Sequence, residues 1–127
     1  MNQRIAFIVL ALICSLPGFA ADTKPANGEQ TISGHLVDLA CAAENSARPD
    51  PKFGATHDKS CLQMPDCVKS GYGVLTSDNK VFKFDSKGNE QAKKFIQMTA
   101  KEKDWKVTVS GPVQGNTIAV NSLMLQK

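Results

Sequence analysis

The chain has 127 residues, with 15 lysines and arginines against 12 aspartates and glutamates, for a net charge of +3 at neutral pH. Charges of both signs are mixed along the chain, which argues against the basic patch of a nucleic-acid-binding protein, so no nucleic-acid partner is expected. A chain of this length supports one domain with one modest hydrophobic core.

The first 20 residues have the pattern of a cleavable secretory signal peptide. An uncharged apolar run from Ile5 to Leu16 is too short for an ordinary transmembrane helix, and small residues occupy positions −3 and −1 of a cut after Ala20. The sequence therefore predicts a periplasmic or secreted protein with no membrane association after cleavage. Residues 21–30 are predicted to be a flexible lead and residues 31–127 to be the domain.

Five short stretches of the mature chain are rich in β-branched or alternating apolar residues, which is typical of strands with a buried face. They are residues 31–41, 72–76, 81–84, 105–110 and 117–125. The connection at 42–71 is rich in proline, glycine and polar residues, and we expect a long loop there with one helical turn. Asn89 is a good N-cap for a helix from residue 90 to about 101, where apolar residues follow helical spacing.

This order of elements is that of a small OB-type barrel. The sequence predicts a mainly β fold with one helix: a five-stranded OB-like barrel, with the helix between strands 3 and 4. A long cysteine-containing loop joins strands 1 and 2. An open α+β sheet is the alternative, because element order alone does not establish that a barrel closes.

One group of side chains could carry chemistry, and it lies in the long connection or at its start: Cys41, His57, Cys61 and Cys67. An exported protein folds in an oxidising compartment, which favours one disulfide and one free thiol. Closing the loop of about 20 residues between Cys41 and Cys61 would contribute about 3 kcal/mol. Pairing of either of these cysteines with Cys67 remains open as well.

The same four residues form a Cys3His set, which suits zinc or copper. Their spacing is not that of a standard zinc finger. Thiol–disulfide exchange is a further alternative, weakened by the absence of a Cys-x-x-Cys motif. The odd cysteine could also form an intermolecular disulfide, which would make the protein a dimer rather than a monomer.

Two aromatic residues are candidates for a ligand-binding face. Tyr72 and Trp105 could stack on a ligand, as aromatic residues do on OB-type surfaces. Trp105 begins an alternating apolar stretch, however, which favours a place in the core. The second histidine, His35, is expected on the surface of the first strand. The sequence contains no nucleophile elbow, phosphate loop or haem-attachment motif, so no enzymatic activity is predicted.

Several short motifs stand out between residues 31 and 125: GHLVDLAC at 34–41, His57-x-x-x-Cys61 followed by Cys67, SGYG at 70–73, FD at 84–85 with GN at 88–89, and KVTVSG at 106–111. Together they resemble a family of uncharacterised small secreted bacterial proteins with an OB-like domain. The resemblance implies an exported single domain and no established activity. It implies that the cysteines and His57 are recurring positions of unknown role.

The sequence thus predicts an exported, non-enzymatic OB-like domain that binds an unknown small molecule or protein. A disulfide holds its Cys/His loop, and no cofactor is required. The alternative is a periplasmic metal-binding protein that uses Cys41, His57, Cys61 and Cys67 to hold zinc or copper.

Overall fold

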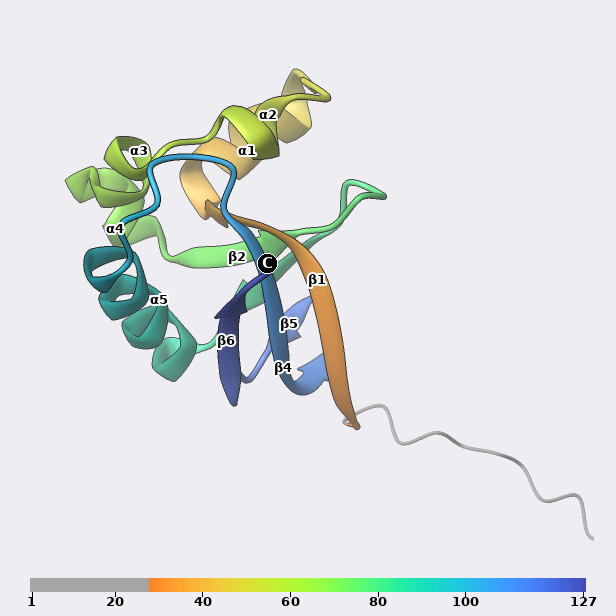
Figure 1. Ribbon diagram of the computed structural model, residues 1–127. Helices are drawn as coiled ribbons and strands as arrows, with labels where there is room; N and C mark the ends of the chain where they lie inside the picture. Colours follow the sequence, from red (N-terminus) through yellow and green to blue (C-terminus); the bar gives the residue numbers. More distant parts are fainter. Residues whose placement is uncertain (1–27) are drawn as a thin grey trace, which may run out of the picture.

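The strands form a closed barrel in the computed structural model, which describes residues 28–127 (Figure 1). The predicted signal peptide and most of the predicted flexible lead lie outside the described residues. The six strands are β1 (Glu29–Asp38), β2 (Tyr72–Leu75), β3 (Val81–Phe84), β4 (Lys106–Gln114), β5 (Thr117–Ile118) and β6 (Ser122–Leu125). Their order is β1-β2-β3-β5-β4-β6, and β1 also pairs with β4. That pairing closes five strands into a barrel and leaves β6 as an extra edge strand on β4.

The predicted OB-like barrel is therefore confirmed, and the open sheet is excluded. Strand β1 makes the closure because it is long enough to pair with two neighbours. Its first part pairs with β4 from Glu29 to His35, and its last part pairs with β2 from His35 to Asp38. The pairing of β3 with β5 is parallel, whereas the other strand pairs are antiparallel. Strand β1 begins at Glu29, two residues before the predicted start of the domain.

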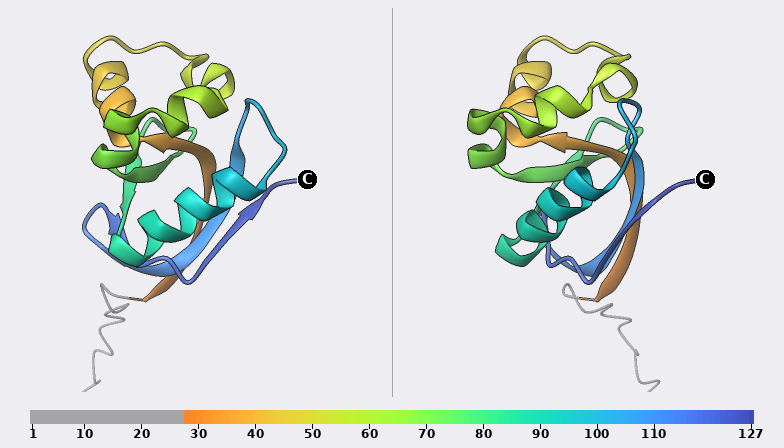
Figure 2. Two further views of the ribbon diagram at one scale, coloured as in Figure 1. Left: turned by 90° about the vertical axis from the view of Figure 1, so that its left-hand side faces the viewer. Right: turned by 60° about the vertical axis from the view of Figure 1, so that its left-hand side comes forward.

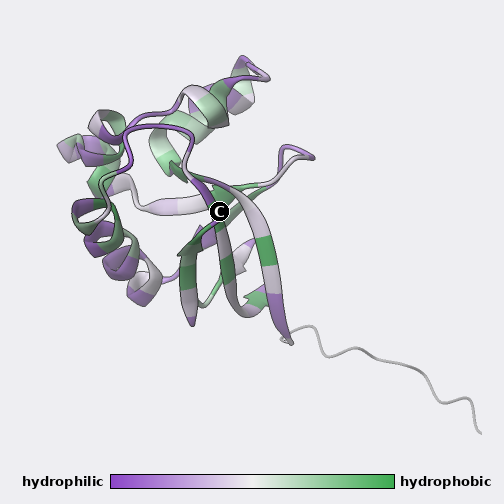
Figure 3. Ribbon diagram, in the orientation of Figure 1, coloured by the Kyte–Doolittle hydropathy of each residue, from purple (hydrophilic) through white to green (hydrophobic). Residues whose placement is uncertain are grey.

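The helix predicted between the third and fourth strands is α5 (Ser86–Met98). Its N-cap is Asp85, whose side chain accepts a hydrogen bond from the Gly88 N–H at 2.8 Å. The predicted cap, Asn89, instead accepts a hydrogen bond from the Tyr72 N–H and so joins the helix to β2. Figure 3 shows hydrophilic residues along α5 and the segment that follows it, while hydrophobic residues lie on the strands.

The core contains both aromatic residues that were candidates for a ligand face. Trp105 is 0% exposed and Tyr72 is 2% exposed, so neither presents a ring to solvent. The Trp105 ring meets the Phe95 ring edge-on, with 6.3 Å between centroids. The Tyr72 hydroxyl donates a hydrogen bond to the Leu62 carbonyl at 2.7 Å. The structure thus corrects the prediction of a Tyr72 and Trp105 ligand face, because both side chains are buried in the hydrophobic core.

The long connection is not a loop. It forms four short helices that lie together at one end of the barrel (Figures 1 and 2): α1 (Leu39–Ala47), α2 (Phe53–Thr56), α3 (Lys59–Gln63) and α4 (Pro65–Ser70). The prolines and glycines that suggested a loop lie mainly at helix ends and between helices. Pro65 is the first residue of α4, and Gly71 ends α4 with a φ of 87°, a conformation that favours glycine. None of the helices in residues 28–127 is long and apolar enough to span a bilayer.

Candidate metal centre

The three cysteines in the described part of the chain occupy equivalent places. Each is the third residue of a short helix: Cys41 in α1, Cys61 in α3 and Cys67 in α4. None of the three forms a disulfide. The predicted disulfide is therefore not found, because helical hydrogen bonds and caps, rather than a covalent bridge, hold the connection against the barrel.

Two of these cysteines follow an aspartate N-cap. Asp38 accepts a hydrogen bond from the Cys41 N–H at 2.9 Å, and Asp58 accepts one from the Cys61 N–H at 2.9 Å. The sequence contains this Asp-x-x-Cys pattern twice, which is the spacing of an N-cap that bonds the third helical residue. The pattern was the signal that could have brought Asp38 into the predicted site.

Asp38 and His57 form a buried pair at the end of β1. The Asp38 side chain is 0% exposed and that of His57 is 4% exposed, and Oδ2 lies 2.8 Å from Nε2. The His57 ring also lies against Phe53, with 5.0 Å between ring centroids. His57 is therefore not the solvated loop residue that a lone histidine in a polar segment would suggest.

Burial alone would raise the pKa of Asp38, but hydrogen bonds reverse the effect. His57, the Cys41 N–H and the Cys67 thiol all interact with the carboxylate, and together they lower its pKa below the ordinary value. Asp38 is consequently ionised at neutral pH and accepts a hydrogen bond from Nε2–H of His57. The carboxylate is thus a negative charge inside the protein, with a hydrogen bond from the Cys41 N–H to one oxygen and from His57 to the other.

The thiols next to this charge are protonated. Burial, followed by the negative charge of Asp38, raises the pKa of Cys41 to about 12. The pKa values of Cys61 and Cys67 are raised as well, in each case mainly by burial. A reactive thiol needs a lowered pKa, so these three thiols lack the environment that thiol–disulfide exchange requires.

The structure brings together three donor side chains that commonly bind metals. One donor atom each from Asp38, Cys41 and His57 lies within 4.8 Å of the other two. We call these residues the Asp–Cys–His cluster. Of the predicted Cys3His set, Cys41 and His57 belong to it, whereas Cys61 and Cys67 do not. Cys67 lies next to the cluster, close enough for its thiol to influence the pKa values of both Asp38 and Cys41.

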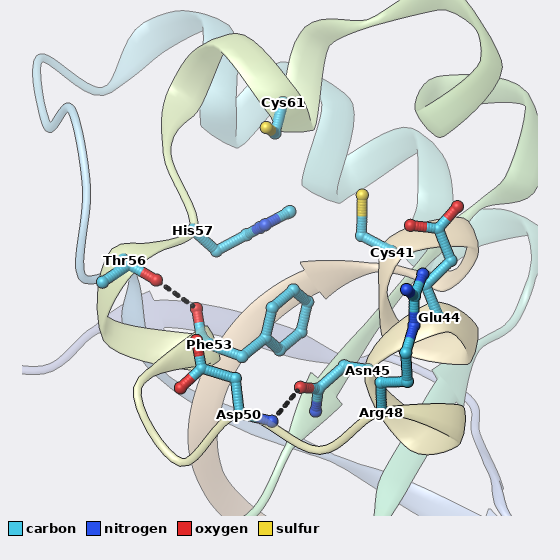
Figure 4. A pocket seen from close by; sticks show the side chains of 9 residues that line it. All are labelled: Cys41, Glu44, Asn45, Arg48, Asp50, Phe53, Thr56, His57 and Cys61. Carbon is cyan, nitrogen blue, oxygen red and sulfur yellow. Dashed lines mark hydrogen bonds between the residues drawn. The ribbon is translucent and has the colours of Figure 1, made fainter.

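An open cavity of about 560 Å³ lies over one side of the cluster (Figure 4). Cys41 on α1, His57 between α2 and α3, and Cys61 on α3 all line it. The remaining lining residues are Glu44, Asn45, Arg48, Asp50, Phe53 and Thr56. The buried side chains of Asp38 and Cys67 are not part of the lining, so the cluster has an inner side and a side that faces the cavity.

The second histidine makes a similar pair elsewhere. His35 Nε2 lies 2.9 Å from Asp104 Oδ1, and both side chains are partly exposed. The hydrogen bond from His35 lowers the pKa of Asp104. His35 thus lies on β1 with its side chain partly exposed, where it is a hydrogen-bond partner of Asp104. This pair offers an internal comparison for the buried pair of His57 and Asp38.

Comparison with known proteins found one partial similarity. The chain is 41% identical over 61 residues to protein delta homolog 2 of Bos taurus, which covers 46% of this chain and 15% of the bovine protein. No protein-family model matches the chain. No solved structure matches it either.

These findings contradict the family resemblance drawn from the sequence motifs. The predicted membership of an uncharacterised family of small secreted bacterial proteins is wrong, because the similarity found is to a mammalian protein. The chain spans only a small share of that protein, so the match does not establish a family for this chain.

Proposed function

We propose that this domain is a zinc-binding protein and that Asp38, Cys41 and His57 are the ligands. The observation that carries the proposal is the distance of 4.8 Å or less between their donor atoms. Tetrahedral zinc with bonds of about 2.0 to 2.3 Å places its ligands about 3.5 Å apart. No pair of these donor atoms therefore has to close by more than about 1.3 Å to reach that geometry.

The charges of the donors favour zinc over copper(I). Asp38 contributes one negative charge, and Cys41 contributes another once the metal displaces its proton. Two negative charges neutralise a divalent cation, which matters because an uncompensated charge is costly in a buried site. Copper(I) would leave one negative charge over, and it prefers sulfur to the carboxylate oxygen that Asp38 offers.

The zinc proposal is tested by competition for Zn²⁺ between the reduced protein and a chromophoric chelator. We expect one equivalent to bind. Cys41→Ser and His57→Gln should each weaken binding by at least the roughly 10- to 100-fold that loss of a supporting group costs. The matched control is His35→Gln, which removes the other histidine–aspartate pair and should leave zinc affinity unchanged. A wild-type protein that binds no stoichiometric zinc would refute the proposal.

Cobalt substitution provides a second readout of the ligands. Co²⁺ in a tetrahedral site with a thiolate ligand shows a sulfur-to-metal charge-transfer absorption. Cys41→Ser should abolish this band, because Cys41 is the sole thiol in the Asp–Cys–His cluster. If the band persisted in Cys41→Ser and disappeared in Cys61→Ser, the sulfur ligand would be Cys61 rather than Cys41, and the proposed set of ligands would be wrong.

Export of the protein remains part of this proposal. The supporting observation is the signal-peptide pattern in residues 1–20. Expression of the full chain in a secreting host, followed by mass measurement of the released protein, tests it. A mature form that begins at Ala21 is expected, and retention of the first 20 residues would contradict it.

A further inference from the structure

Among the donors in and around the Asp–Cys–His cluster, only some are reachable from solvent. Asp38 is 0% exposed and Cys67 is 4% exposed, so the inner side of the cluster is closed. Cys41 and His57 face the cavity, and Cys61 lines the same cavity from α3 (Figure 4). A cation that approaches from the cavity therefore meets the Cys61 thiol as well as the two ligands that face it.

Cys61 is near the cluster without belonging to it. Its sulfur is not among the atoms that lie within 4.8 Å of one another. Three protein ligands leave the fourth position of tetrahedral zinc open, and zinc sites with an open position exchange or bind further ligands. Resting on the zinc site proposed above, we propose that Cys61 is an entry ligand, which binds the cation transiently and passes it to Cys41 and His57. The site then takes up and releases zinc as exchangeable cargo.

The first turn of α3, which carries Cys61 at the cavity, is held by hydrogen bonds to another segment of the chain. The Lys59 N–H donates to the Glu102 carbonyl at 2.6 Å, and the Lys59 Nζ donates to the Thr99 carbonyl at 2.8 Å. Asp58 caps the same turn through the Cys61 N–H. These contacts tie α3, and with it Cys61, to the segment that follows α5.

The buried nitrogen and oxygen atoms of the cluster already have hydrogen-bond partners without a metal, which favours reversible binding of zinc. In residues 28–127 no buried side-chain nitrogen or oxygen lacks a hydrogen-bond partner. Loss of zinc therefore leaves Asp38 bonded to His57 rather than unpaired in the interior. The rim of the cavity carries the carboxylates of Glu44 and Asp50 against the single guanidinium of Arg48, a balance that favours a cation over an anion.

The transfer is a ligand exchange with no change in oxidation state. A zinc–sulfur bond to Cys61 forms as a bond between zinc and its donor breaks, and the proton of the Cys61 thiol passes to the released donor ligand. In the second step zinc bonds to the Cys41 sulfur, to Asp38 and to one ring nitrogen of His57, whose single proton stays on the other ring nitrogen; the bond to Cys61 breaks, and the Cys41 proton passes to the Cys61 sulfur. Zinc remains divalent throughout. At the end Cys41 is bound to zinc as a thiolate, and Cys61 is a protonated thiol again.

The experiment is stopped-flow measurement of zinc uptake from a zinc–chelator complex and of zinc release to excess chelator. We expect Cys61→Ser to slow both rates by a similar factor of about ten or more, so that the equilibrium affinity stays nearly constant. Ser60→Ala is the matched control, because it alters the same turn of α3 without removing a thiol, and it should keep both rates.

Three results separate the outcomes. A Cys61→Ser variant with weaker affinity and an unchanged uptake rate would show a resident ligand and overturn the inference. Unchanged rates in both directions would overturn it as well. Absence of zinc binding by the wild-type protein would instead overturn the proposed function, so the two failures are distinguishable.

Discussion

Replacement of Asp38 by alanine should destabilise the protein more than replacement of Asp58, although both aspartates cap a helix in the same way. Each side chain accepts a hydrogen bond from the third residue of its helix at 2.9 Å. Loss of that cap costs about 1 kcal/mol at either position. Asp38 also accepts the buried hydrogen bond from His57, and a hydrogen bond to a charged group contributes about 1.5 to 3 kcal/mol. We therefore expect a cost of about 2.5 to 4 kcal/mol for Asp38→Ala against about 1 kcal/mol for Asp58→Ala.

The assay is urea-induced unfolding in the presence of reductant and a metal chelator, so that only the protein's own interactions are compared. Equal dependence of the unfolding free energy on urea in both variants would show that the unfolded states are comparable. Asp38→Asn should have a free energy of unfolding between those of the wild type and Asp38→Ala, because asparagine is a good N-cap but lacks the charge that His57 contacts. If Asp38→Ala and Asp58→Ala had the same free energy of unfolding, the buried pair would contribute no net stability and the reasoning would be refuted.

The remaining predictions concern pH and one core hydrogen bond. Because the pKa of Cys41 is raised to about 12, zinc must displace its proton, and zinc affinity should rise about tenfold per pH unit near neutrality; a flat pH profile in the chelator assay would contradict this. The lowered pKa of Asp38 means that its stabilising effect is present above the pKa of an unfolded aspartate and is lost as pH falls through the folded value. Asp38→Asn should therefore flatten the acid side of a stability–pH curve measured by thermal unfolding. Tyr72→Phe removes the hydroxyl that donates to a carbonyl of α3 and should cost about 1 kcal/mol in urea, whereas no change would show that water replaces the bond.

The barrel could be predicted from the sequence because its strands carry their own signal. In β4, residues Val107, Val109 and Val113 are buried while their neighbours are more exposed, which is the alternation visible in the sequence. The helix α5 shows its buried residues at helical spacing for the same reason. Both patterns arise because one face of each element packs on the core.

The connection between β1 and β2 could not be predicted because three of its four helices are too short to show a helical period. Helix α2 has four residues, α3 has five and α4 has six. Helices of this length are unstable in isolation, and contacts with the rest of the protein decide whether they form. Their prolines and glycines, which suggested a loop, are compatible with helix ends.

The sequence alone determined the barrel order and the concentration of Cys41, His57, Cys61 and Cys67 in one connection. Only the tertiary structure decided which of them meet. Asp38 lies 19 residues before His57, and the two are 2.8 Å apart because α1 and α2 reverse the chain at the end of the barrel. Local residue patterns report which face of an element is buried, whereas the partner of a buried carboxylate depends on how separate elements pack. That packing replaces the expected Cys3His set with the Asp–Cys–His cluster.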